Sequence, residues 1–203
     1  MGWFGYGLED GDSTTTTAIT FLEKAKVVSN DGEIHLKKGM DEVYGLSIRD
    51  MVLNDDALAK LYLNFDKAFA GILPKPVANG SLKLKDVPTH RIYKNYHEEN
   101  VLIPIQMVAL LFIANKARMP RNLLSMAKEA NSMLINSEHT DDFDSPSKRR
   151  KVLRNFQKQL DEADIKATRY WSNARKKITH KKVAKKTEPE TAPAKATVKA
   201  KRP

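Results

Sequence analysis

The segment from Ile103 to Ala117 most constrains the fold, because as a helix it is apolar almost all round. Its large apolar side chains are Ile105, Met107, Val108, Leu110, Leu111, Phe112 and Ile113. A helix of this kind is either covered by protein all round or embedded in a membrane. The apolar stretch is interrupted by Pro104 and Gln106 and falls short of the about 20 residues that a membrane-spanning helix needs. We therefore predict a buried central helix and no membrane partner.

Apolar residues recur at intervals of three and four along the segments around this helix, which is the spacing of a helix with one buried face. The segments are 18–28, 41–52, 58–72, 123–134 and 152–163. Asn54, Pro120 and the pair Ser145-Pro146 stand where a helix starts, since Asn and Ser cap helix N-termini and Pro suits the first turn. The fold class predicted is mainly α: a compact helical domain of five to seven helices with a basic helical extension and a disordered C-terminal tail.

A long connection is predicted over residues 73–97, which contain Pro74, Pro76, Gly80 and Pro88. We expect a short strand at 81–85 within it. Its end, residues 90–97, mixes cations with tyrosines, which is a combination used to hold phosphates and stack bases. Tyrosines that attach the loop to the body of the protein would give the same pattern.

The charge of the chain is divided between its two parts. Residues 148–203 carry 19 Lys and Arg against 5 Asp and Glu, whereas residues 1–147 carry 16 against 20. We expect a helical body over 1–145, a basic amphipathic helix over 146–180 that can dock on the body, and a disordered Lys/Ala/Pro tail over 181–203, because such a composition cannot bury enough surface to offset chain entropy.

Clustered cations indicate a polyanionic partner, because phosphates can replace their small counterions. The prediction is non-specific binding of DNA or RNA, since lysine favours loose phosphate contact over reading of bases. The predicted nucleic-acid-binding residues are Lys148, Arg149, Arg150, Lys151, Arg154, Lys158, Arg169, Trp171, Arg175, Lys176, Lys177, Lys181, Lys182, Lys185 and Lys186.

The N-terminal pattern Gly5, Gly7, Asp10 and Asp12, followed directly by a predicted helix, resembles the start of a family of small helical bacterial and viral proteins whose activity is uncharacterised. That family begins with a Trp-Gly-x-Gly pattern and then Asn-Asp, whereas Phe4 stands here in the place of the Trp and Gly11 in the place of the Asn. The resemblance implies a helical fold and supplies no catalytic residue. The tail is similar in composition to the basic tails of linker-histone-like proteins.

Two other function classes stay open. One is a protein-interaction module, such as an immunity, inhibitor or virion component, that acts through the helical body. The other is an enzyme built around His90, His97 or His139, for which no partner residue can be assigned. The acidic segment 138–144 offers metal-ligand atoms, but its spacing fits an interhelix turn better than a calcium or zinc site.

No cofactor is expected, and the chain has no cysteine, which excludes thiol catalysis and disulfides. No secretory signal can be read at the N-terminus. We expect an intracellular protein of the cytoplasm, nucleoid or nucleus, with a virion as the alternative.

Overall fold

The computed structural model describes residues 8, 14–27, 47–81, 83–86, 101–137, 140 and 144–170. These residues form six α-helices and two 3-10 turns and contain no strand, so the predicted mainly α fold class is confirmed. The helices are α1 (Thr14–Lys24), α2 (Asp55–Ile72), α3 (Lys75–Ala78), α5 (Ile103–Ala114), α6 (Arg121–Ile135) and α8 (Pro146–Lys166), and the 3-10 turns are η1 (Ile48–Asp50) and η2 (Leu84–Asp86).

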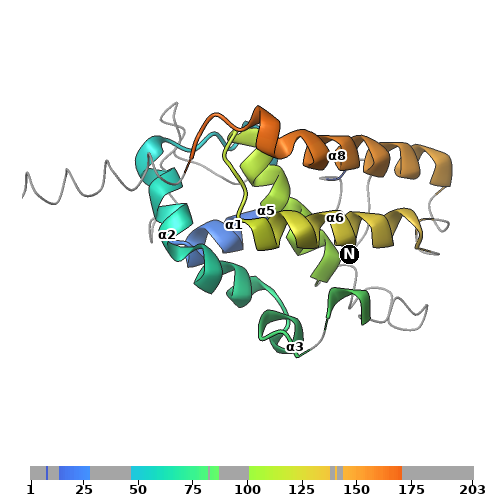
Figure 1. The fold of residues 1–203 in the computed structure, drawn as a ribbon, viewed down its shortest axis with the longest axis horizontal. Helices are drawn as coiled ribbons and strands as arrows, with labels where there is room; N and C mark the ends of the chain where they lie inside the picture. The colour runs from blue at the N-terminus through green and yellow to red at the C-terminus, as the bar shows by residue number, and fades with distance from the viewer. Residues whose placement is uncertain are drawn as a thin grey trace, which may run out of the picture.

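Helix α5 lies at the centre of the fold, with α1, α6, α8 and η1 packed around it (Figure 1). Every residue from Ile103 to Phe112 is buried, so the prediction of a covered central helix is confirmed. The helix ends at Ala114, three residues earlier than expected. Within the described residues, no helix is both long enough and apolar enough to cross a membrane.

Aromatic side chains join α1, α2 and α5 on one side of the core. The ring of Phe65 lies 6.1 Å from that of Phe21 and 5.8 Å from that of Phe112, both edge-on, and it stacks on Phe69 at 5.2 Å between centroids. Such pairs stabilise a fold by about 0.5 to 1.5 kcal/mol each beyond the burial of their area. The apolar face predicted for α2 is therefore confirmed.

Two predicted elements differ from the structure. In the second predicted helix, residues 41–46 lie outside the described residues, 48–50 form a 3-10 turn, and Met51 to Leu53 are not helical. The reason is the side chain of Asn115, which accepts a hydrogen bond from the Leu53 N–H (2.7 Å) and donates one to the Met51 carbonyl (2.9 Å), so this backbone is bound to α5 instead of to itself. The strand expected at 81–85 is wrong, because the turn η2 forms there and buries Leu84.

Helix α8 packs side by side with α6 and also contacts α5 (Figure 1). Its apolar side chains Leu153, Phe156 and Leu160 are buried in the same core as those of α5. The basic helix that the charge pattern sets apart from the body is thus part of the helical domain itself.

The chain leaves the helical path after Lys166, although apolar spacing suggested a continuing helix. The Thr168 N–H donates to the Lys116 carbonyl, and the Arg118 N–H donates to the Arg169 carbonyl, each at 2.9 Å. Residues 167–170 therefore run beside the segment that follows α5, because that segment offers backbone groups that a further helical turn would leave without partners. The predicted tail over 181–203 lies outside the described residues.

Candidate nucleic-acid interface

A stripe of three exposed cations, Lys151, Arg154 and Lys158, runs along the outer face of α8. Residues spaced by three and four share one face of a helix, and the opposite face holds the buried Leu153 and Phe156. The packing of that apolar face therefore fixes the direction of the cations. We call Lys151, Arg154 and Lys158 the α8 stripe.

The α8 stripe has no acidic partner within the part of the chain that the structure describes. The carboxylates of α8 are instead paired with other cations: Asp161 with Lys128 (2.8 Å), Asp164 with Arg118 (3.8 Å) and Glu162 with Lys166. The positive charge of the stripe is therefore not neutralised by the acidic end of its own helix.

The Asp161 carboxylate illustrates this pairing. A hydrogen bond from Lys128 lowers its pKa below the ordinary value, and a second one from Gln157 acts in the same direction. A lowered pKa in the folded state means that the ion pair stabilises the fold above the ordinary carboxyl range and that this contribution is lost as pH falls. The effect is small because the pair is exposed to solvent.

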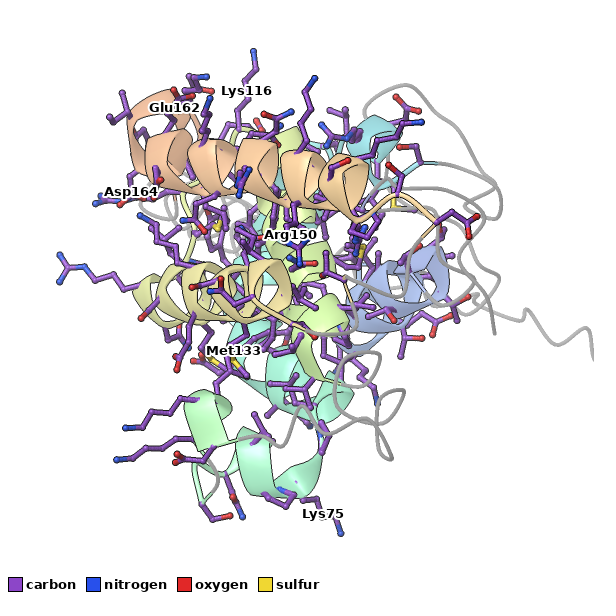
Figure 2. All side chains as sticks on the ribbon, turned by 90° about the vertical axis from the view of Figure 1, so that its right-hand side faces the viewer. Lys75, Lys116, Met133, Arg150, Glu162 and Asp164 are labelled. Carbon is purple, nitrogen blue, oxygen red and sulfur yellow. The ribbon has the colours of Figure 1, made fainter. Side chains whose placement is uncertain are left out.

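Two of the arginines predicted to contact nucleic acid face inward. Arg149 is only 1% exposed, because it stands four residues before Leu153 and so shares the buried face of α8. Arg150 is half-buried, and its Nε donates to the Ile135 carbonyl at the end of α6 (3.3 Å), between the two helices in Figure 2. Arg149 is a correction to the predicted surface, whereas the neighbouring Lys148 is exposed.

Arg169 is a second correction. Its guanidinium donates to the Asp55 carboxylate (2.9 Å) and to the Leu53 carbonyl (3.0 Å). This side chain links the segment after α8 to the start of α2, so its hydrogen bonds stabilise the fold. The other predicted contacts, Trp171, Arg175, Lys176, Lys177, Lys181, Lys182, Lys185 and Lys186, lie outside the described residues.

The structure also shows a cavity of about 470 Å³ that the sequence did not predict. It lies between α8, the end of α5 and η1. Its described lining consists of Arg49, Phe112, Ile113, Lys116, Ala117, Gln159, Ala163, Lys166 and Thr168. These residues come from three separate segments of the chain. The one local signal in the sequence is the Asn115-Lys116 helix end, a position where Gly is common.

The histidines of the enzyme hypothesis, His90, His97 and His139, all lie outside the described residues, as does most of the acidic segment 138–144. Among the described residues, no three His, Asp or Glu side chains gather in a way that could hold a metal ion. No protein family, curated protein or solved structure was found to match this chain.

Proposed function

We propose that this protein binds DNA or RNA without sequence preference, through the α8 stripe together with the lysines of its C-terminal region. The observation that supports the proposal most directly is the stripe itself: three exposed cations on one rigid helix face with no acidic partner among the described residues. Cations on a fixed face can contact successive phosphates of a nucleic-acid backbone and release their counterions.

The direction of charge along α8 adds support. Its first turn contains no acidic residue, and its carboxylates Asp161, Glu162 and Asp164 come in the second half. A helix is stabilised by the opposite order, because its N-terminus carries partial positive charge and its C-terminus partial negative charge. Stability of α8 therefore does not explain this order, whereas attraction of a polyanion to the positive end does.

The proposal is tested by replacing Lys151, Arg154 and Lys158 together with Gln in the full-length protein. Affinity for a duplex and for a single strand is measured by fluorescence anisotropy over a series of salt concentrations. Each lost phosphate contact should lower the slope of log affinity against log salt by about one, so the triple variant should lose about three from that slope.

A matched control replaces three exposed lysines far from α8: Lys75, Lys83 and Lys85. Figure 2 places Lys75 at the opposite end of the molecule from α8. The control variant has the same net charge as the stripe variant and should keep a salt slope close to that of the wild type. Equal losses in both variants would contradict a role for the stripe, and equal affinity of the wild type for heparin and nucleic acid would contradict a preference for nucleic acid.

A further inference from the structure

The cavity beside α8 has the size and lining of a small-ligand site. Its volume of about 470 Å³ falls within the range of about 300 to 1,000 Å³ that is usual for ligand pockets. The apolar part of its lining, which we call the apolar floor, consists of Phe112, Ile113, Ala117 and Ala163. The remaining lining is polar, and it includes three cations.

The three cations are Arg49 from η1, Lys116 from the end of α5 and Lys166 from the end of α8. Lys166 is also paired with Glu162, so a bound anion competes with that carboxylate. Two lysines and an arginine around an apolar floor suit a ligand that has an anionic group and a planar or apolar part. A phosphate next to a base has this chemistry.

Gln159 also favours a ligand in this cavity. Its Oε1 atom is shielded from solvent and accepts no hydrogen bond among the described residues, and the residue lines the cavity. A buried acceptor without a donor destabilises the fold. Rotation of this amide toward the cavity would let its oxygen accept a hydrogen bond from an amino group of a bound base.

Lys116 also favours a functional role for this cavity, because its backbone is strained. It has a φ of 47°, and it occupies the position after the α5 C-cap, where the Lys116 N–H donates to Ile113 and the Ala117 N–H donates to Phe112. Glycine is the usual residue in this motif, because a Cβ atom is crowded by the following carbonyl oxygen in this conformation. A strained residue on the rim of a cavity is a reason to look for function there.

We propose that this cavity binds one nucleotide, with its phosphate between Lys116, Lys166 and Arg49 and its base on the apolar floor. The nucleotide is either one unit of a single strand that follows the α8 stripe or a free mononucleotide. Lys158 and Lys166 are about 12 Å apart along the helix axis, so a strand on the stripe passes close to the cavity. The strand version rests on the proposed function, and it requires a preference for single strands, because bases inside a duplex are stacked and cannot enter.

The test compares two matched variants, Lys116→Gly and Lys26→Gly. Lys26 has the same role at the end of α1, with a φ of 58°, and it does not line the cavity. Both variants lose one charge and one strained side chain. We expect both to unfold at higher temperature, but Lys116→Gly alone should bind a single-stranded oligonucleotide about three- to tenfold more weakly, as is typical for the loss of one charge-assisted contact.

Three further measurements complete the test on the full-length protein: binding of the matching duplex, calorimetric binding of adenosine monophosphate, and the cavity-filling variant Ala163→Phe. Duplex affinity should be the same in the two lysine variants, and Ala163→Phe, checked for its helical circular dichroism, should lose the preference for single strands. A wild type that binds single strand and duplex equally and does not bind the mononucleotide overturns the inference while leaving the proposed function intact.

Failure of the proposed function can be distinguished from failure of the cavity inference. If no oligonucleotide binds but adenosine monophosphate binds and Lys116→Gly weakens it, the proposed function fails and the cavity remains a site for a free nucleotide. If Lys116→Gly and Lys26→Gly bind every probe alike, Lys116 has only a structural role and the inference is wrong.

Discussion

Lys26 and Lys116 each have a strained backbone conformation. Both adopt a positive φ directly after a helix, where glycine avoids the clash of a Cβ atom. We expect Lys26→Gly and Lys116→Gly each to raise the free energy of unfolding by about 1 kcal/mol, measured by urea denaturation. Lys60→Gly, in the exposed middle of α2, is the control and should instead lower it by about 1 kcal/mol.

Tyr62 is a residue whose titration reports on the fold. Burial raises the pKa of its hydroxyl to about 12, although Arg169 and Arg118 oppose the shift, and this hydroxyl donates to the Arg118 carbonyl at 2.7 Å. The unfolded chain ionises this tyrosine near its ordinary pKa of about 10. The folded state then holds the proton more tightly, so stability is present below pH 10 and is lost as pH rises toward 12.

Alkaline unfolding tests this assignment. The free energy of unfolding should fall more steeply between pH 10 and pH 12 in the wild type than in Tyr62→Phe. Parallel pH profiles for the two proteins would show that Tyr62 is not the group responsible.

At the scale of helices, a chain of side-chain hydrogen bonds ties α5, α6 and α8 together. Gln106 donates to Asn131 (2.9 Å), and Asn131 in turn donates to the Leu153 carbonyl and to Gln157, each at 3.0 Å. Gln157 donates to Asp161 (3.3 Å) at the surface. Because the Leu153 carbonyl can only accept, the orientation of each amide in the chain is fixed.

Replacing Asn131 with Ala should lower the free energy of unfolding by about 2 to 4 kcal/mol. The change removes buried hydrogen bonds and leaves the Gln106 amide without its acceptor, at about 1 to 3 kcal/mol for each unsatisfied group. The control is Asn136→Ala at the exposed end of α6, where the side chain donates to the Ser132 carbonyl one turn earlier. If chemical denaturation gives similar values for both variants, the buried chain of hydrogen bonds does not stabilise the helix packing.

At the scale of the whole molecule, α8 shares one core with the other helices. Phe156 is 1% exposed and belongs to the same apolar cluster as α5 and α6. Phe156→Ala should therefore cost about 3 to 5 kcal/mol and shift a single unfolding transition of the whole domain. Ile165→Ala, on the same helix but 85% exposed, should leave the transition in place. Two separate transitions would show that α8 is an independent extension.

The mainly α fold and its central helix could be predicted because burial follows directly from spacing. Residues 103–112 are apolar apart from Gln106, and a helix of that composition has no polar face to turn toward water. The start of α2 could also be predicted, because Asn is favoured at the N-cap position. In the structure the Asn54 side chain accepts a hydrogen bond from the Ala57 N–H, as an N-cap does. These features depend on neighbours within a few residues of one another.

The site could be predicted only in part. The sequence indicated a cationic face on the helix after Pro146, and the structure places Lys151, Arg154 and Lys158 there. It did not separate these from Arg149, which has the same charge but lies on the buried side. Counting charges does not distinguish a cation that faces water from one whose side chain is buried against neighbouring helices.

The sequence by itself determined α1, α2, α5, α6 and the start of α8, the apolar residues that these helices bury and the excess of positive charge after residue 147, because these follow from local spacing and composition. Only the tertiary structure decided that α8 belongs to the body, that it ends at Lys166 and that Arg169 reaches Asp55. It also decided that Arg49, Lys116 and Lys166 surround one cavity. The physical reason is that these outcomes depend on contacts between different helices and loops, such as Arg169 with Asp55. Local spacing does not indicate which distant backbone group or carboxylate a side chain will meet.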